Sequence, residues 1–323
     1  MKTLRFGIIG CGDFGMRHAK RLDAMPGVVV AALSDPRPEA VERVRQALSR
    51  APELVASDHR DLLACGLDAV CIASPDSYHV RQVLDALSAG AHVLCEKPLT
   101  PDAAELDRVV RARDRTGKVV ALTYPRRYDP SHRAMRREIL SGRWGTVTAI
   151  TVYNAEDWIT PNRGTWRHDP TICPGGFFYD ASGHQLDMIM WATGLSGLRV
   201  RAWSDNAGAP VPIRVWGAAA LTGDVPVTFH FVGDAHVWRE IINIHCEGRD
   251  FCVQNFRAMW CPLRAPEPIE PSEPGEGPDA EFVSMIRDDA PNPAPPEGAR
   301  HVLRFTEAAL RSAACRRSVR VRD

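Results

Sequence analysis

The chain has 323 residues, of which 45% are hydrophobic and 25% are charged, with 40 basic and 40 acidic side chains. This length exceeds the usual size of one domain, so two domains around two cores are expected. The balance of charge excludes the basic surface that nucleic acid or an anionic membrane would require, and no apolar run in the sequence reaches membrane-spanning length. A small-molecule partner is therefore favoured.

Nine cysteines are spread over apolar segments, and none of them forms a C-x-x-C pair. Buried thiols of a reducing compartment explain this distribution better than a disulfide framework does, and the spacing typical of zinc ligands is missing. The residues before the first apolar run are too few for a signal peptide. We therefore expect a cytoplasmic protein with no metal site.

The first apolar run, Leu4 to Ile9, leads into a glycine-rich turn and then a helical pattern over Met16 to Ala24. This context of strand, turn and helix makes G-x-G-x-x-G a fairly specific signal for a dinucleotide, with a purely structural turn as the alternative. The first glycine permits the tight turn, the second lets the backbone approach a pyrophosphate, and the third lets helix and strand pack closely. The bare helix N-terminus attracts phosphate. The candidate cofactor contacts of this turn are Gly10, Gly12, Asp13, Phe14 and Gly15.

The second apolar run, Val28 to Leu33, is followed by Asp35 and Arg37. An acidic side chain at the end of the second strand is where a carboxylate accepts hydrogen bonds from the adenosine ribose. Asp35 therefore favours NAD, because it would repel a 2′-phosphate. Arg37 leaves NADP as the alternative cofactor, because its guanidinium is suited to binding a 2′-phosphate. Two other roles are equally open to it: stacking on the adenine, and a solvent-exposed position in the loop.

Two more loops follow predicted parallel strands, Ala69 to Ala73 and Val93 to Cys95. Ligands of an open parallel sheet bind beyond the carboxyl ends of its strands, so both loops are expected at the cofactor. A lysine held there by a following proline can bind a carbonyl or hydroxyl oxygen through a charged hydrogen bond. The candidate contacts are Ser74, Pro75, Asp76 and His79 in the first loop, where the histidine has a second interpretation as a helix-start residue, and Glu96 and Lys97 in the second.

Beyond the strand Val119 to Thr123 the pattern of the chain changes. Runs with a period of two predict a mostly antiparallel sheet with one covered face. We place the domain boundary near Leu122, with a dinucleotide-binding domain over residues 1–122 and a second α/β domain over residues 123–323. The expected strands of the second domain are Val147 to Tyr153, Leu198 to Trp203, Val211 to Leu221, Val225 to Phe231, Ile241 to Cys246 and Phe251 to Gln254. A Pro-rich loop is expected over Ala265 to Asp279, before helices over Ala280 to Arg287 and Arg300 to Ala314.

The stretch from Gly175 to Asp187 combines a glycine pair with the spacing of a buried helix. In one continuous helix, Asp180 and His184 stand at i and i+4, so both side chains would reach one substrate oxygen from neighbouring turns. A carboxylate beside an imidazole is suited to acid–base chemistry. The alternative to a catalytic pair is a structural role, in which Asp180 is an acidic residue near the helix start and His184 is a core histidine bonded to a backbone partner.

The chain resembles the Gfo/Idh/MocA oxidoreductases over essentially its whole length. The triplet Glu-Lys-Pro and the pattern Asp-x-x-x-His, found together at this separation, are highly specific. The motifs that carry the resemblance are Gly10-Cys11-Gly12-Asp13-Phe14-Gly15, Glu96-Lys97-Pro98, Arg127-Tyr128-Asp129-Pro130, Trp166-Arg167, and Gly175-Gly176 with Asp180, His184 and Asp187.

This resemblance implies an N-terminal Rossmann doubly wound parallel sheet plus a C-terminal α/β domain with an open, mostly antiparallel sheet. In such proteins the open sheet often forms the interface of a homo-oligomer, a dimer or a tetramer. The resemblance also implies catalytic roles for Lys97, Asp180 and His184, and a structural role is expected for Asp187. Asp76 departs from the family, which often has asparagine at that place.

A polar and aromatic segment ahead of the catalytic helix suits a hydroxyl-rich ligand. Its candidate substrate contacts are Tyr153, Asp157, Trp158, Arg163, Trp166 and Arg167, with Asn154 beside them and Arg127 and Tyr128 across from them in the family arrangement.

The function expected from these residues is hydride transfer between a nicotinamide and a secondary alcohol or ketone of a sugar, cyclitol or related polyol. A ketoreductase of a nucleotide-linked deoxysugar or a secondary-metabolite ketone would use the same three residues in the opposite direction. An NAD-dependent glycosidase and a non-enzymatic NAD-binding regulator are more remote alternatives, since the glycosidase loops are not evident and a regulator has no use for the catalytic set.

Overall fold

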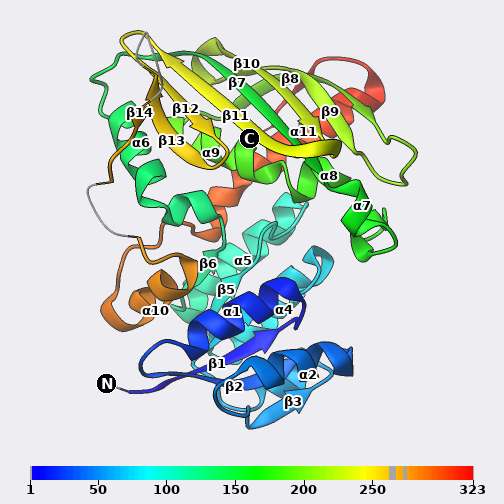
Figure 1. The fold of residues 1–323 in the computed structure, drawn as a ribbon, viewed down its shortest axis with the longest axis vertical. Helices are drawn as coiled ribbons and strands as arrows, with labels where there is room; N and C mark the ends of the chain where they lie inside the picture. Colours follow the sequence, from blue (N-terminus) through cyan, green and yellow to red (C-terminus); the bar gives the residue numbers. More distant parts are fainter. Residues whose placement is uncertain (1, 262–266, 272–274, 323) are drawn as a thin grey trace. The chain divides into compact units, whose positions relative to one another are not determined.

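The computed structural model describes residues 2–261, 267–271 and 275–322, and their backbone falls into two compact units (Figure 1). One unit contains Met1–Pro125 and Glu276–Glu297, and the other contains Arg126–Gly275 and Gly298–Asp323. Parts of the expected Pro-rich loop, residues 265–266 and 272–274, lie outside the described residues. In the described part of the chain, no helix is both long and apolar enough to cross a bilayer.

A six-stranded parallel sheet forms the centre of the first unit, in the order β3-β2-β1-β4-β5-β6. Its inner strands are almost wholly apolar, as expected for a sheet covered on both faces. The chain crosses from β3 back past β1 to β4, which places a switch point beyond the carboxyl ends of β1 and β4. The strands are β1 (Leu4–Ile9), β2 (Val28–Ser34), β3 (Leu54–Ala56), β4 (Ala69–Ile72), β5 (His92–Cys95) and β6 (Val120–Leu122).

Helices join consecutive strands of this sheet, as the alternating pattern predicts. Gly117 in the left-handed conformation ends the longest of them, and Asp102 caps its N-terminus by accepting from the Ala104 amide at 2.7 Å. The helices are α1 (Asp13–Asp23), α2 (Pro38–Ala47), α3 (His59–Leu63), α4 (His79–Ser88) and α5 (Ala103–Thr116), with the short 3₁₀ turn η1 (Asp76–Tyr78). A second 3₁₀ turn, η2 (Pro125–Tyr128), begins at the last residue of this segment and continues into the second unit.

A segment from near the C-terminus completes the first unit, which differs from the expected division at Leu122. Helix α10 (Pro278–Asp288) packs Phe282 edge-on against Phe6 of β1, with ring centroids 6.1 Å apart. The chain then runs along β6, where the Leu122 amide donates to the Ala294 carbonyl at 2.8 Å. These contacts join residues far apart in sequence, so local periodicity carried no sign of them.

The second unit contains a nine-stranded sheet in the order β14-β13-β12-β11-β7-β10-β9-β8-β15, antiparallel except between β7 and β10. With the parallel sheet of the first unit, this confirms the predicted fold class. β7 and β11 extend beyond their predicted ends, and β13 to β15 were not predicted. The strands are β7 (Val147–Asp157), β8 (Gly197–Asp205), β9 (Arg214–Leu221), β10 (Val225–Val232), β11 (Asp234–Cys246), β12 (Asp250–Gln254), β13 (Arg257–Cys261), β14 (Glu267–Pro268) and β15 (Val319–Arg320).

Helices cover one face of this sheet (Figure 1). The inward residues of β7 and β10 alternate with outward ones, and Val152, Phe229 and Phe231 join Phe178 and Leu186 in one apolar core. The helical elements are α6 (Pro130–Leu140), α7 (Ile159–Asn162), η3 (Trp166–His168), α8 (Gly176–Asp180), α9 (Gly183–Thr193), η4 (Thr222–Asp224), η5 (Pro296–Ala299) and α11 (Arg300–Cys315).

The other face of the sheet carries a row of directly opposed side chains, Trp203, Trp216, His230 and Tyr153, on β8, β9, β10 and β7. The two tryptophans are 43% and 37% exposed in the single chain. We call this set the aromatic row.

Candidate active site

The glycine turn after β1 has the geometry that each of its glycines predicts. Gly10 has φ +92°, and a Cβ there would stand 2.5 Å from the Ser74 amide nitrogen. A Cβ on Gly15 would stand 1.9 Å from the Gly10 carbonyl oxygen, so α1 could not approach β1 as it does. A Cβ on Gly12 would meet nothing within 4 Å, which leaves open space beside the turn.

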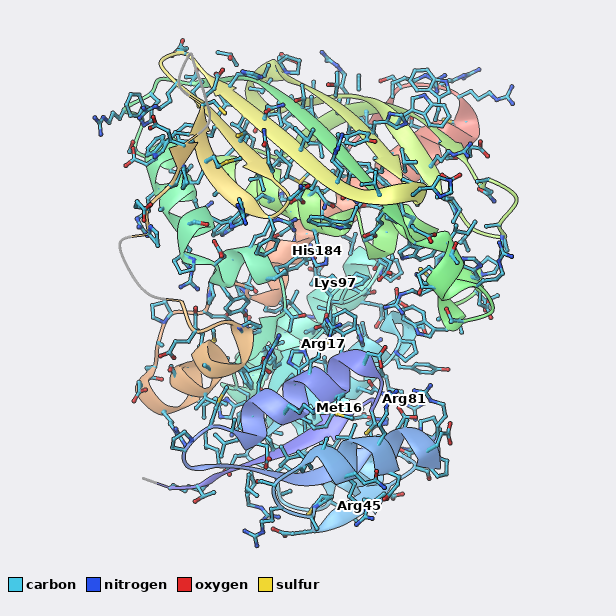
Figure 2. The ribbon with its side chains drawn as sticks, in the orientation of Figure 1. Met16, Arg17, Arg45, Arg81, Lys97 and His184 are labelled. Atoms are coloured by element: carbon cyan, nitrogen blue, oxygen red, sulfur yellow. The ribbon has the colours of Figure 1, made fainter. Side chains whose placement is uncertain are left out.

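Helix α1 begins directly after Gly12, and no side chain caps its N-terminus. Its first amide groups therefore face that open space with the positive end of the helix dipole. Asp13 is exposed and pairs with Arg43 at 3.2 Å. The guanidinium of Arg17 lies over the ring of Phe14, 5.2 Å from the ring centroid. Figure 2 labels Arg17 on this helix.

The carboxylate of Asp35 is fixed in place after β2. Its Oδ2 accepts from the Cys11 amide at 2.8 Å, which joins it to the glycine turn, and its Oδ1 accepts from the Arg37 amide at 2.9 Å and from Arg37 Nε at 3.1 Å. Burial raises the pKa of Asp35, but the hydrogen bonds and charge of Arg37 outweigh it, and the pKa lies below its usual value. Asp35 is therefore an anionic acceptor at neutral pH.

The loops after β4 and β5 are joined by His79, which is 1% exposed. Its Nδ1 lies 2.8 Å from the Pro98 carbonyl oxygen and its Nε2 lies 2.8 Å from the Ser74 carbonyl oxygen. Burial lowers its pKa and outweighs the opposing effect of the two carbonyls. A neutral ring has one N–H, so His79 donates to one of the two carbonyl oxygens and lies packed between the loops after β4 and β5.

The remaining candidates of these loops have different environments. Ser74 Oγ donates to Gln82 at 2.6 Å, Pro75 is half-buried, and Asp76 is buried and accepts from the Ser77 amide at 3.0 Å. Lys97 is half-buried, and its amide donates to Glu96 Oε2 at 3.3 Å. The turn of Glu96 and Lys97 thus lies beside the Ser74 loop at the same edge of the sheet.

The first unit fits a dinucleotide at this edge. The uncapped start of α1 and the open space at Gly12 suit a pyrophosphate, and the fixed carboxylate of Asp35 suits a ribose diol.

In the second unit the predicted continuous helix is wrong. α8 ends at Asp180 and α9 begins at Gly183, and the His184 amide donates to the Ala181 carbonyl at 3.2 Å rather than to the carbonyl of Asp180. At the break itself the Ser182 amide donates to the Phe177 carbonyl, five residues back, at 3.2 Å. At the start of α8, Gly176 has φ +51°, and a Cβ there would stand 2.4 Å from the Pro212 carbonyl oxygen, so α8 packs closely against this backbone.

Asp180 is 6% exposed and is held by two of the predicted substrate residues. Its Oδ2 accepts from Trp158 Nε1 at 3.0 Å and from Arg167 Nε at 2.8 Å. The Arg167 guanidinium lies 4.3 Å from the ring centroid of Trp166. The sequence predicted these residues as substrate contacts and gave no sign that Trp158 and Arg167 donate to the Asp180 carboxylate.

Helix α9, which carries the half-buried His184, is anchored by two buried arginines of η2. Arg127 donates to both oxygens of Asp187, from Nε at 3.0 Å and from Nη2 at 2.6 Å. Arg126 pairs with Glu240 of β11, which also accepts from Gln185 of α9 at 2.7 Å. Arg127, predicted as a substrate contact, is thus buried in an ion pair with Asp187.

Other predicted substrate residues lie apart from Asp180. Tyr153 belongs to the aromatic row on the uncovered face of the sheet, so its side chain points away from α8 and α9, whereas Asn154 is buried on the helix side. Asp157 is exposed and accepts from the Thr160 amide at 3.0 Å, and Arg163 is exposed at the end of α7.

Sequence reasoning missed His18 and Asp279, which lie 2.5 Å apart in the first unit. The position of His18 within the first turns after the glycine motif was the only signal available, and nothing local pointed to its partner.

Two family models match this chain. The NAD-binding Rossmann-fold model of the Gfo/Idh/MocA oxidoreductase family matches residues 4–124, and the C-terminal domain model of the same family matches residues 132–248.

Similar proteins include inositol 2-dehydrogenases of Acidiphilium cryptum (38% identical over 58% of this chain and 54% of its own length) and Streptomyces avermitilis (36% identical over 65% of this chain and 59% of its own length). The matches thus span little more than half of these relatives. A crystal structure of scyllo-inositol dehydrogenase from Lactobacillus casei with bound NAD(H) and scyllo-inositol has a TM-score of 0.83, at 21% identity and 99% coverage of both chains, which shows a shared fold. On the two family models and the sheets described above, the chain belongs to the Gfo/Idh/MocA oxidoreductase family.

Proposed function

We propose that the chain is an NAD-dependent dehydrogenase that moves a hydride between nicotinamide and a secondary alcohol carbon of a cyclitol, sugar or related polyol. The observation that carries this proposal is the dinucleotide site around Gly12, with Asp35 fixed by the Cys11 amide. The relatives named inositol 2-dehydrogenase make a cyclitol the first substrate to try.

NAD supplies the hydride acceptor when it is bound. Asp35 favours NAD over NADP, because its anionic carboxylate would accept two ribose hydroxyls and repel a 2′-phosphate. Arg37, which covers Asp35 through 3.1 and 3.3 Å hydrogen bonds, would then move aside or stack on the adenine.

In the proposed reaction, His184 takes the hydroxyl proton during oxidation and returns it during reduction. Lys97 donates a charged hydrogen bond to the same oxygen and stabilises the negative charge that develops there. Asp180 orients a substrate hydroxyl, and Trp158 and Arg167 keep its carboxylate in one orientation. Trp166, Arg167, Asp157 and Arg163 remain proposed contacts of the polyol.

We also propose that the chain forms a dimer or tetramer through the sheet face that carries the aromatic row. Exposed tryptophans on a flat sheet favour such an interface. Light scattering should give more than one chain per particle, and Trp216→Glu should reduce that number, whereas Leu140→Glu on α6 should not. A monomeric wild-type protein would contradict this part of the proposal.

The activity is tested by mixing the protein with NAD and a panel of cyclitols, sugars and their ketones while following the absorbance of the reduced cofactor. We expect reduced cofactor to form with at least one cyclitol or sugar. Lys97→Ala and His184→Ala should each lower turnover about 10²–10⁴-fold, with NADH binding largely kept. Turnover near that of the wild type would remove either residue from the mechanism.

Other outcomes of the same panel identify the competing functions. Activity confined to ketones or deoxysugar nucleotides would indicate a ketoreductase. Hydrolysis of a glycoside without net cofactor reduction would indicate a glycosidase. Tight NAD binding with no turnover on any substrate would indicate a regulator.

A further inference from the structure

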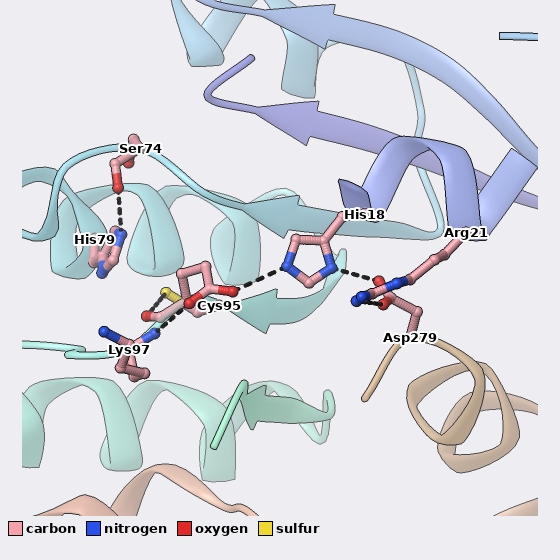
Figure 3. A network of polar contacts seen from close by, with 8 residues as sticks. His18, Arg21, Ser74, His79, Cys95, Lys97 and Asp279 are labelled. Carbon is pink, nitrogen blue, oxygen red and sulfur yellow. Dashed lines mark hydrogen bonds and ion pairs between the residues drawn. The ribbon is translucent and has the colours of Figure 1, made fainter. Parts of the chain in front are cut away.

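Next to the candidate cofactor site, His18 of α1 is enclosed between two carboxylates from distant segments (Figure 3). Its Nδ1 lies 2.5 Å from Asp279 Oδ1 of α10, a residue 261 positions away, and its Nε2 lies 3.1 Å from Glu96 Oε1 after β5. The side chains of His18 and Asp279 are 3% and 2% exposed, so water does not replace either contact.

Two carboxylate acceptors require two N–H donors from one ring, and only the imidazolium form provides them. Cys71 of β4 also faces His18, and Arg21 of α1 lies 3.2 Å from Asp279 Oδ2. The groups that face Glu96 besides His18 are Lys97, Thr123, His79 and Cys95. Burial lowers the pKa of His18, but Cys71, Asp279 and Glu96 raise it, and the result lies well above the ordinary value. His18 is therefore cationic at neutral pH.

Glu96 connects this cation to Lys97. One carboxylate oxygen of Glu96 faces His18, and the other accepts from the Lys97 amide at 3.3 Å. On the far side of the turn, His79 holds the Pro98 carbonyl. A histidine thus lies on each side of the turn that carries Lys97, and the two histidines come from different helices.

We propose that His18, anchored on Asp279, is a positioning residue for Lys97: its imidazolium holds Glu96 in the orientation that fixes the Lys97 turn at the nicotinamide side of the site. The proposal rests on the proposed function for the role of Lys97 in hydride transfer. It gives the returning segment of 276–297 a function, because Asp279 supplies the charge that keeps His18 protonated.

Loss of the proton from His18 would leave a ring nitrogen lone pair against a carboxylate, and Glu96 would turn away from it. The Lys97 turn would then lose one of its two anchors. Activity should consequently fall as pH rises through the titration of His18, even though His18 touches neither substrate nor nicotinamide.

Asp279→Asn tests the proposal, since it keeps the shape of the side chain and removes the charge. The alkaline limb of the kcat profile should move to lower pH by about one unit or more, because an opposing charge within hydrogen-bond reach shifts a titration by about 1–3 units. Asp85→Asn is the matched control. His59 of the same unit also lies between two carboxylates, Asp58 at 3.3 Å and Asp85 at 2.8 Å, and it does not contact Glu96.

Two measurements on the free protein make the test independent of turnover. Nitrogen-15 NMR of the His18 ring should show an imidazolium at neutral pH that titrates at lower pH in Asp279→Asn. The rate at which acetic anhydride acetylates Lys97, followed by mass spectrometry, should change in the same pH range in the wild type and shift with the His18 signal in the variant.

A neutral His18 ring at neutral pH in the wild type would overturn the proposal. So would a shifted His18 titration in Asp279→Asn with unchanged kcat and Lys97 acetylation profiles. If Asp279→Asn does not fold, the wild-type protein alone still tests the proposal. In it, the rate of Lys97 acetylation should change over the same pH range in which the His18 ring titrates, and a rate that does not follow this titration would overturn the proposal. A protein that passes the free-protein measurements but turns over no substrate would contradict the proposed function and leave the positioning role in place.

Discussion

At the scale of single residues, the carboxylate of Asp180 is fixed by two donors of the second unit. The indole of Trp158 and the guanidinium of Arg167 both donate to Oδ2, at 3.0 and 2.8 Å. Charge-assisted hydrogen bonds of this kind are stronger than neutral ones and restrict the carboxylate to one orientation. A substrate hydroxyl would therefore meet an acceptor that is already oriented.

Trp158→Phe should lower kcat/KM for the preferred polyol about 10–100-fold, because one hydrogen bond to a charged group contributes about 1.5–3 kcal/mol. NADH affinity, measured by cofactor fluorescence, should stay near the wild-type value. Trp144→Phe is the control, since Trp144 makes the same indole–carboxylate bond to Glu138 at 3.0 Å away from Asp180. Equal losses in both variants would contradict a specific role for Trp158.

Two glycines of the turn should respond to alanine in opposite ways. Gly12→Ala should leave the free energy of unfolding within about 1 kcal/mol of the wild type, since φ is −70° and the new Cβ meets nothing. It should nevertheless weaken NADH binding about 10–100-fold, because the Cβ keeps the pyrophosphate from the helix amides. Gly15→Ala should destabilise the first unit by about 1–3 kcal/mol or more, since its Cβ meets the Gly10 carbonyl.

The stability of the first unit in both glycine variants is measured by hydrogen exchange of the α1 amides. Tryptophan fluorescence does not report on this unit, because all eight tryptophans lie in the second unit. Unchanged NADH affinity in a well-folded Gly12→Ala would argue against a pyrophosphate at this turn.

The difference between what the sequence predicted and what it did not is clear among these residues. Gly10, Gly12 and Gly15 were predictable because their roles depend on backbone geometry within one turn. The partners of His18 and Asp180 were not, because a hydrogen bond between side chains distant in sequence leaves no local pattern. Asp279, in particular, is the last residue of the Pro-rich loop predicted over Ala265 to Asp279.

At the scale of elements, α9 depends on a buried ion pair. Arg127 and Asp187 have side-chain exposures of 6% and 2%, and Arg127 also donates to the Gly298 carbonyl at 3.0 Å. This contact joins η2, α9 and η5, three elements of the second unit that are distant in sequence. The position of His184 consequently depends on a pair at the next turn of its helix.

Arg127→Met should lower the free energy of unfolding of the second unit by about 3–5 kcal/mol, because it leaves a buried carboxylate uncompensated. Tryptophan fluorescence during urea unfolding follows this unit. The double variant Arg127→Met with Asp187→Leu should recover most of the loss, since apolar replacement of both partners removes the unpaired charge. Arg199→Met, in an exposed pair with Asp224, is the control and should leave the midpoint unchanged. A double variant no better than the single one would contradict this account.

The elements also show where periodicity was insufficient. The helical spacing around Asp180 and His184 predicts one helix, but the hydrogen bonds change between α8 and α9, where the Ser182 amide donates to the Phe177 carbonyl and the His184 amide to the Ala181 carbonyl. The edge strands β14 and β15 were missed because strands of two residues have no alternation to detect.

At the scale of the whole molecule, stability should depend on pH through His18. Its pKa in the folded protein lies well above the usual value of about 6.5, so its contribution to stability is complete below that pH and is lost as pH rises through the raised pKa. Protection of α1 amides relative to His18→Asn at the same pH should therefore be greatest near neutrality and decline on the alkaline side. A difference that grows with rising pH would contradict a cationic His18.

The central claim is that this chain transfers a hydride from a polyol carbon to NAD, and an isotope tests it most directly. A cyclitol carrying deuterium on the carbinol carbon is incubated with the protein and NAD, and the reduced cofactor is analysed by mass spectrometry. The account predicts that the deuterium appears on the nicotinamide and that His184→Ala abolishes the transfer. Deuterium that stays in the substrate or is lost to water, across a panel of cyclitols and sugars, would contradict it.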